Sequence, residues 1–148
     1  MDKRSMLSVM ERVLENAKVG ILATVATDGK PRMRWMTPAV VRGREGFLYA
    51  VTSPKFGKAA QLDKNPHVEW MLQTKQLDEV VTVNGTVQII DSPSTKADIQ
   101  EAIGGNLGVF WKLNSDPGDL IVLETIIEEI TYFKPISGEK AVVRLDEE

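Results

Sequence analysis

The sequence predicts a mainly β protein, an antiparallel β-barrel with a few α-helices. Three observations lead to this prediction. Six or seven segments rich in Val, Ile, Thr and aromatic residues alternate apolar with polar positions, and their lengths are about ten residues on average. Short turn signals such as Asp28-Gly29 join the early segments, which favours antiparallel neighbours. Helical periodicity is confined to a few stretches, and many antiparallel strands with few helices commonly close into a barrel.

The elements follow one another in a simple order. Apolar residues recur at helical spacing over 3–17, which predicts an amphipathic N-terminal helix. Within the strand expected at 80–90, Asn84-Gly85 predicts a bulge or a close backbone approach. Ser92-Pro93 predicts the start of a helix that ends at Gly104-Gly105. The strands are expected at 19–27, 30–42, 47–52, 67–73, 80–90 and 120–133, and a charged tail over 137–148 adds a short strand at 141–143.

Length and composition bound the class of protein. The 148 residues contain no domain linker, so 1–148 is expected to be a single domain. A net charge of −3 argues against a nucleic-acid-binding surface. The absence of cysteine and the single histidine, His67, argue against a metal site and against a catalytic triad. No apolar run reaches membrane-spanning length and the N-terminus lacks a signal-peptide core, so we expect a cytoplasmic protein without a membrane partner.

One stretch carries an electrostatic peculiarity. Ser53-Pro54 predicts the start of a short helix that ends before Asn65-Pro66. Lys55 and Lys58 share one face near its N-terminus, where the helix dipole disfavours each cation by a few tenths of a kcal/mol, up to about 1. A phosphate bound there would make these terms favourable. Alternatively, both lysines point into water.

Several short motifs together carry a family resemblance. They are Asp28-Gly29-Lys30-Pro31-Arg32-Met33-Arg34, Phe47-Leu48-Tyr49-Ala50-Val51-Thr52, Lys58-Ala59-Ala60-Gln61-Leu62 and Asn65-Pro66-His67-Val68. In this order and spacing, the chain over about 5–133 resembles the pyridoxamine 5′-phosphate oxidase-like family, and within it the small general-stress-protein branch. The resemblance implies an FMN-binding split β-barrel of Greek-key type. It also implies an obligate homodimer that binds flavin mononucleotide (FMN) between its subunits.

The resemblance assigns candidate cofactor residues. Arg34 matches an arginine beside the flavin's phosphate and ribityl chain, Thr52 a strand-end threonine that contacts the cofactor, and Lys58 the phosphate-binding lysine. The full set of expected cofactor residues is Arg34, Trp35, Met36, Val51, Thr52, Ser53, Lys55, Lys58 and Trp111. No catalytic residue and no metal ligand is expected.

The chain also departs from the family pattern. The oxidases commonly have Ser-Arg-Lys where this chain has Phe56-Gly57-Lys58, so one phosphate arginine and one hydroxyl have no match. Lys55, expected on the same helix face as Lys58, is the candidate to replace this arginine. Those oxidases have a lysine that reaches the flavin ring, and this chain has Ala39 at the corresponding position. The C-terminal arginine and histidine that hold pyridoxal substrates have no clear match in 134–145. The resemblance therefore implies flavin binding but not vitamin B6 oxidation.

The aromatic residues admit more than one interpretation. Trp35 is either a core aromatic, the interpretation we favour, or a residue near the flavin or the dimer interface. Trp70 is expected in the core, and Trp111 is the candidate for a residue of the partner subunit near a bound ring. His67 is expected to cap or to face solvent.

Two functions from different classes remain. The first is a flavin-dependent oxidoreductase acting on an unidentified small molecule, in which the flavin ring supplies the chemistry. The second is a flavin-binding or flavin-free stress-response protein without turnover. A deazaflavin or haem in the same cleft is a third alternative.

Overall fold

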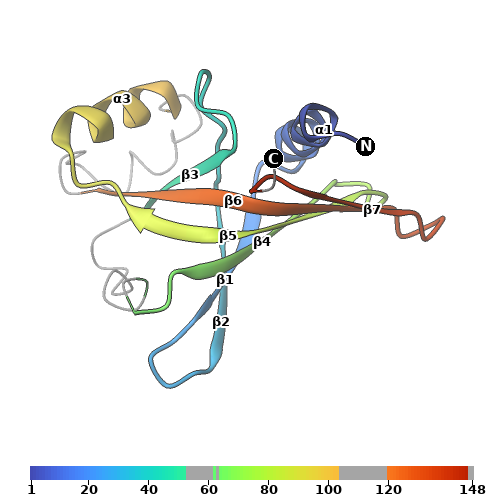
Figure 1. Ribbon diagram of the computed structural model, residues 1–148, viewed down its shortest axis with the longest axis horizontal. Helices are drawn as coiled ribbons and strands as arrows, with labels where there is room; N and C mark the ends of the chain where they lie inside the picture. Colours follow the sequence, from blue (N-terminus) through green and yellow to red (C-terminus); the bar gives the residue numbers. More distant parts are fainter. Residues whose placement is uncertain (53–61, 63, 104–119, 147–148) are drawn as a thin grey trace.

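A computed structural model of the protein describes residues 1–52, 62, 64–103 and 120–146. Seven antiparallel strands form one sheet, with β2, β1, β4, β5, β6 and β3 side by side and β7 paired to β6 (Figure 1). The elements are α1 (Lys3–Ala17), β1 (Gly20–Val25), β2 (Pro31–Met36), β3 (Phe47–Thr52), β4 (His67–Gln73), β5 (Val80–Ile89), α3 (Pro93–Ile103), β6 (Ile121–Phe133) and β7 (Lys140–Arg144).

A single bridge closes this sheet into a barrel. Ala39, just beyond β2, pairs with Tyr49 of β3 through two backbone hydrogen bonds of 2.7 and 2.9 Å. Within the described residues, no other pairing joins the two edge strands, β2 and β3. Because β4 returns to lie beside β1, the first four strands follow a Greek-key order. The predicted antiparallel barrel is confirmed.

The β1–β2 hairpin sets the register of its two strands. Gly29 has a φ of 82°, which a glycine adopts without strain, and the Lys30 backbone N–H donates to Asp28 Oδ1 at 3.0 Å. Beyond this turn, Leu22 lies opposite Arg34 and Ile21 lies opposite Trp35. The strand expected at 30–42 is shorter than predicted, and Pro38, which has no N–H to donate, follows its end.

The predicted irregularity in β5 is confirmed. The register between β5 and β6 shifts between Asn84 and Gly85. A Cβ atom on Gly85 would lie 2.2 Å from the backbone oxygen of Ile126, so a glycine is required by this close approach.

Two clusters of buried side chains hold the layers together. The larger fills the inner side of the barrel and includes Met6, Met10 and Val13 of α1, with Trp70 of β4 in the same cluster. Trp70 is 1% exposed and donates from Nε1 to Thr125 Oγ1 at 3.0 Å, so the predicted core position is confirmed. The smaller cluster joins α3, through Ile99 and Ile103, to the outer side of β3 and β6.

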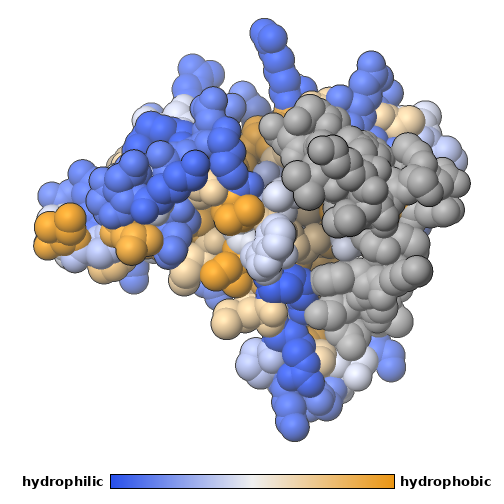
Figure 2. Space-filling model, turned by 180° about the vertical axis from the view of Figure 1, so that it is seen from behind, coloured by the Kyte–Doolittle hydropathy of each residue, from blue (hydrophilic) through white to orange (hydrophobic). Residues whose placement is uncertain are grey.

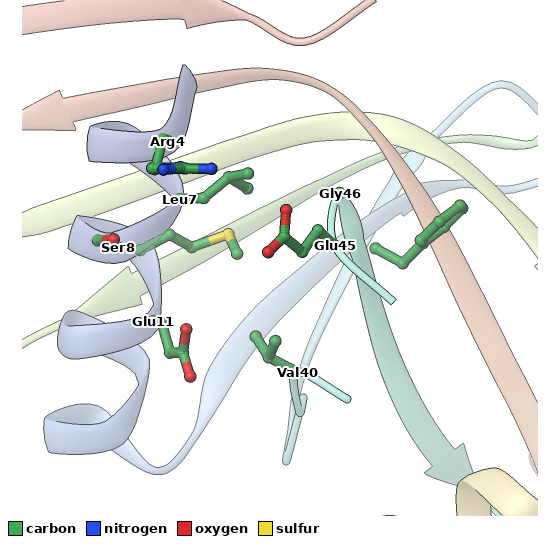
Figure 3. Close-up of a pocket in the computed structure, with 9 residues that line it drawn as sticks. Arg4, Leu7, Ser8, Glu11, Val40, Glu45 and Gly46 are labelled. Carbon is green, nitrogen blue, oxygen red and sulfur yellow. The ribbon is translucent and has the colours of Figure 1, made fainter. Parts of the chain in front are cut away.

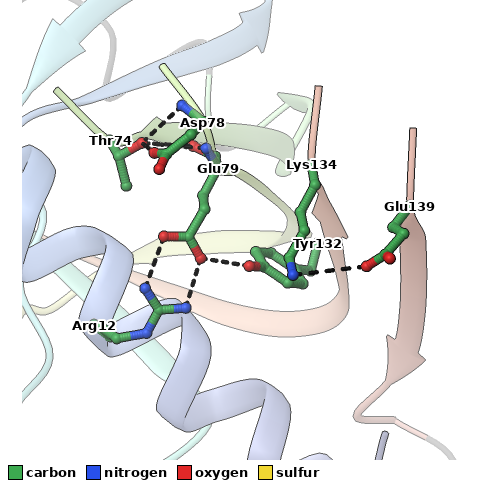
Figure 4. A network of polar contacts seen from close by, with 7 residues as sticks. All are labelled: Arg12, Thr74, Asp78, Glu79, Tyr132, Lys134 and Glu139. Carbon is green, nitrogen blue, oxygen red and sulfur yellow. Dashed lines mark hydrogen bonds and ion pairs between the residues drawn. The ribbon is translucent and has the colours of Figure 1, made fainter. Parts of the chain in front are cut away.

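A polar network fastens α1 to the far end of β5 and β6 (Figure 4). The Arg12 guanidinium donates two hydrogen bonds to the carboxylate of Glu79, of 2.8 and 2.6 Å. The Tyr132 hydroxyl donates to the same carboxylate. These contacts hold the pKa of Glu79 at about 2, chiefly through the hydrogen bonds from Arg12.

The sequence prediction is wrong about Trp35. Its side chain is 72% exposed, on the outer side of the sheet, so it is not a core aromatic. The expected helix over 54–64 falls mostly outside the described residues, and so does the stretch around Trp111. The charged tail contributes β7, which pairs with β6 from Lys140 to Arg144. None of the described helices is long and apolar enough to cross a membrane.

Candidate functional site

The inner side of β2 carries an arginine where a core residue would be usual. Arg34 lies opposite Leu22, which is 1% exposed and belongs to the barrel core. Cross-strand partners point to the same side of a sheet, so Arg34 faces inward together with Met36, two residues further on. Trp35 faces outward.

Thr52 ends β3 on the same inner side. Its neighbours at alternate positions, Leu48 and Ala50, belong to the barrel core, and Thr52 itself is 7% exposed. The Ala39–Tyr49 bridge lies three residues from Met36 and three residues from Thr52. We call the region where β2 and β3 separate the opening. Arg34 and Met36 face the inner side of the barrel from β2, and Thr52 faces it from β3.

Burial and a hydrogen bond to Thr24 contribute to the environment of Arg34. Its Nη2 donates to Thr24 Oγ1 at 3.0 Å, and Thr24 is 3% exposed. Burial lowers the pKa of the Arg34 guanidinium. Arginine nevertheless stays charged at neutral pH, so this opening holds a partly desolvated positive charge. Arg32, on the same side of the sheet, is exposed and lies 3.5 Å from Asp28 in an ion pair.

Two of the cavities beside α1 differ in whether their size suits a nucleotide. A cavity of about 90 Å³ lies between α1 and the turn before β3, with Leu7, Val40, Glu11 and Glu45 in its wall (Figure 3). Ligand pockets usually span about 300–1,000 Å³, so this one is too small for a nucleotide. A second, of about 350 Å³, is lined by Ala39 and its neighbours and by the C-terminal part of α1. It lies where β2 continues toward the bridge.

The buried carboxylate of Glu124 is a structural group. Its two oxygens accept hydrogen bonds from the Tyr49 hydroxyl at 2.7 Å and from Gln88 Nε2 at 2.6 Å. Burial raises the pKa of the Tyr49 hydroxyl, with the hydrogen bond to Glu124 adding to the shift. The cluster lies on the side of β3 and β6 that α3 covers and joins three neighbouring strands. It therefore faces away from the inner opening.

The described part of the chain brings some of the predicted cofactor residues together and separates others. Arg34, Met36 and Thr52 share the inner side. Val51 points the other way, is 4% exposed and packs in the cluster beneath α3. Ser53, Lys55, Lys58 and Trp111 lie outside the described residues.

Sequence reasoning missed Thr24. The signal was present, because the Asp28-Gly29 turn sets the hairpin register and alternation puts Thr24 on the side of Leu22 and Arg34. Thr24 lies directly opposite Arg32 and diagonal to Arg34, within reach of a long side chain. Among residues 1–52, 62, 64–103 and 120–146, no three His, Cys, Asp or Glu side chains are grouped as metal ligands.

The fold and the site define a class of protein. An antiparallel Greek-key barrel, closed by one bridge and carrying a cation at the opening between its edge strands, is a split β-barrel. Residues 6–134 match the sequence profile of the pyridoxamine 5′-phosphate oxidase family, and the chain belongs to this family. No protein of curated function matches the sequence significantly.

Solved structures support the fold. One is a Clostridium acetobutylicum protein related to general stress protein 26 of B. subtilis, with a TM-score of 0.76 at 16% identity over 99% of this chain and 98% of that chain. Another is a pyridoxamine 5′-phosphate oxidase-related, FMN-binding protein from Nostoc punctiforme, with a TM-score of 0.67 at 16% identity over 95% and 96%. A heme-binding protein from Mycobacterium smegmatis has a TM-score of 0.69 at 16% identity, over 90% of this chain and 57% of that one.

Proposed function

We propose that this protein binds FMN and acts as a flavin-dependent oxidoreductase on a small molecule. The observation that carries the proposal is the inward-facing, partly buried Arg34 of β2, with the buried Thr52 on the inner side of β3. A guanidinium and a hydroxyl are donors suited to a phosphate. Family membership and an FMN-binding neighbour of the same fold support this ligand.

The residues present fit a flavin nucleotide. Arg34 and Thr52 would hold its phosphate, with Lys55 and Lys58 of the adjoining segment as further cations. Bound flavin supplies the electron-transfer chemistry. The protein's own contribution is then to bind, to orient and to place positive charge near the phosphate.

A titration tests the proposal. Apo-protein is titrated with FMN and with riboflavin, which lacks the phosphate. A hydrogen bond to a charged group contributes about 1.5–3 kcal/mol, so Arg34→Gln and Lys58→Ala should each weaken FMN binding about 10- to 100-fold. Riboflavin binding should hardly change. Arg32→Gln is the matched control, because Arg32 is exposed and paired with Asp28. Equal losses for both ligands would show that neither residue holds phosphate.

Haem, a deazaflavin and a flavin-binding role without turnover are distinguished by further measurements. A haem-binding neighbour of the same fold makes haem the specific alternative. The sole histidine, His67, is exposed at the start of β4, outside the inner opening. The visible spectrum of the purified protein, with mass spectrometry of any compound released on denaturation, identifies the cofactor. Pyridoxamine 5′-phosphate should be a poor substrate, measured as pyridoxal phosphate formation, because 134–145 lacks the matching residues of the oxidases.

We also propose that the protein is a homodimer. Four apolar side chains are exposed on the outer side of β2, β1 and β4, and we call them the outer patch: Ile21, Met33, Trp35 and Met71. Met33 and Trp35 are each 72% exposed. Several hydrophobic side chains lie near the middle of the face shown in Figure 2, next to hydrophilic ones.

The outer patch favours a second copy of the chain as its occupant. A two-fold axis sets the same patch against itself, and apolar surface is complementary to apolar surface. β2 carries Trp35 on its outer side and Arg34 on its inner side. A dimer through this patch would therefore bring the strand that bears the phosphate site to the subunit boundary, as the family's cofactor cleft requires.

A further inference from the structure

Thr24 contributes a hydroxyl group to the inner side of the barrel, where apolar side chains predominate. It is 3% exposed, and its Oγ1 accepts the hydrogen bond from Arg34 Nη2 at 3.0 Å. Thr24 lies opposite Arg32, while Arg34 lies opposite Leu22. The Arg34 side chain therefore reaches along the hairpin, toward its turn, to meet Thr24. An aliphatic side chain of the same shape, such as valine, would fill this position without accepting the bond.

The hydrogen bond to Thr24 can orient the Arg34 guanidinium without neutralising its charge. A hydroxyl oxygen accepts a hydrogen bond from one of the five guanidinium N–H groups, and the hydroxyl group carries no charge. The bond to Thr24 therefore fixes the direction of the Arg34 head group and leaves its positive charge in place. Burial of the guanidinium, which also lowers its pKa, strengthens its attraction for an anion compared with an exposed arginine.

Orientation matters because arginine is flexible. Ordering a free arginine side chain on binding costs up to about 2 kcal/mol of conformational entropy. A side chain already held in its bound orientation avoids much of this cost when the ligand arrives. Since Thr24 is on the core-facing side of β1 and is itself buried, it is a rigid anchor for such a contact.

We propose that Thr24 is a positioning residue that holds the Arg34 guanidinium in the orientation that meets a nucleotide phosphate. The inference rests on the proposed function, in that Arg34 is the residue through which Thr24 acts. It adds a member to the phosphate site that neither the family resemblance nor the motifs pointed to.

The test uses two variants of Thr24 and one matched control. Thr24→Val keeps the shape and removes the acceptor, and Thr24→Ser restores it. Thr125→Val is the control, because Thr125 is 1% exposed and accepts a hydrogen bond of the same length, 3.0 Å, from Trp70. Apo forms of all variants are titrated with FMN and riboflavin. The quantity compared is the ratio of the riboflavin dissociation constant to the FMN dissociation constant. Circular dichroism and urea midpoints report folding.

The ratio distinguishes positioning from a structural role. Thr24→Val should weaken FMN binding about 3- to 10-fold relative to riboflavin, Thr24→Ser should restore the ratio to within about 2-fold, and Thr125→Val should lower stability without moving it. If Thr24→Val leaves the ratio unchanged while Arg34→Gln lowers it, the positioning role is wrong and the phosphate site stands. If Arg34→Gln also leaves the ratio unchanged, the phosphate site itself is wrong.

A second measurement needs no flavin. In the apo-protein, nuclear magnetic resonance should show slow rotation and slow proton exchange for the Arg34 Nη groups in the wild type and in Thr24→Ser. Thr24→Val should make both the rotation and the proton exchange of these groups faster. Unchanged Arg34 signals in Thr24→Val would overturn the proposed positioning, whatever the cofactor proves to be.

Discussion

Removing the carboxylate of Glu79 should weaken the attachment of α1 in a pH-dependent way. Both carboxylate oxygens accept hydrogen bonds from Arg12, and one also accepts from Tyr132. Glu79→Gln keeps the length of the side chain and an oxygen that can accept from Tyr132. It removes the charge that Arg12 faces, and with it the charge-assisted bidentate pair.

The size of the effect follows from the pKa of Glu79. The folded protein holds it at about 2, against 4.5 for an ordinary glutamate. At about 1.4 kcal/mol per tenfold change in the proton-binding constant, this difference corresponds to about 3 kcal/mol. The Arg12 side chain is 56% exposed, so solvent screens the pair, and we take about half of that value, about 1.5 kcal/mol.

The sign is determined by the direction of the shift. A carboxyl group whose folded pKa is depressed stabilises the folded state above its unfolded pKa. The contribution is therefore complete above about pH 4.5 and is lost as the pH falls from 4.5 toward 2. The wild type should exceed Glu79→Gln by about 1.5 kcal/mol at pH 7, and the two should converge near pH 2.

Urea unfolding followed by circular dichroism at several pH values measures this difference. Glu139→Gln is the matched control, because Glu139 is 71% exposed and lies 3.6 Å from Lys134 in a surface ion pair. Its effect should stay within about 0.5 kcal/mol at every pH. A difference between wild type and Glu79→Gln that is constant from pH 7 to pH 2, or that equals the control, would refute the reasoning.

Two further predictions concern the outer side of the sheet and the bulge. Trp35→Ser should shift the protein from dimer to monomer in sedimentation velocity without loss of fold, whereas Ile136→Ser, at an 88% exposed turn residue away from the outer patch, should not. A dimeric Trp35→Ser would place the interface elsewhere. Gly85→Ala should lower the free energy of unfolding by more than about 2 kcal/mol, because its Cβ meets the backbone oxygen of Ile126. Gly20→Ala should cost less, since its Cβ meets a flexible side chain, and equal thermal shifts in the two variants would contradict this account.

Local patterns predicted the elements well because each element depends on a local rule. The Asp28-Gly29 turn and strict alternation predicted that Arg34 and Trp35 lie on opposite sides of β2, and the structure has them so. Alternation could not predict which side is covered, because α1 and the other strands, distant in sequence, provide that cover. Trp35 was therefore assigned to the core, although it belongs to the exposed side.

The site was predictable only in part for a similar reason. Arg34 and Thr52 could be found from motifs, but the Ala39–Tyr49 bridge that brings their strands to one opening depends on the irregular chain between β2 and β3. That chain follows no simple periodicity. The sequence did not single out Thr24, because threonine is common in strands and its hydrogen bond to Arg34 is known only from the structure.

The alternation along β2 makes the hairpin turn a determinant of function. Arg34 and Trp35 are neighbours in the chain, so one strand presents a cation to the interior and an indole to the exterior. Shifting β2 by a single residue would exchange them, expelling the charge from the opening and driving the indole inward. Both proposed activities of β2, ligand capture and self-association, would fail together. An insertion in the Asp28-Gly29 turn that shifts the register of β2 would therefore abolish both binding functions, although every side chain of the strand is retained.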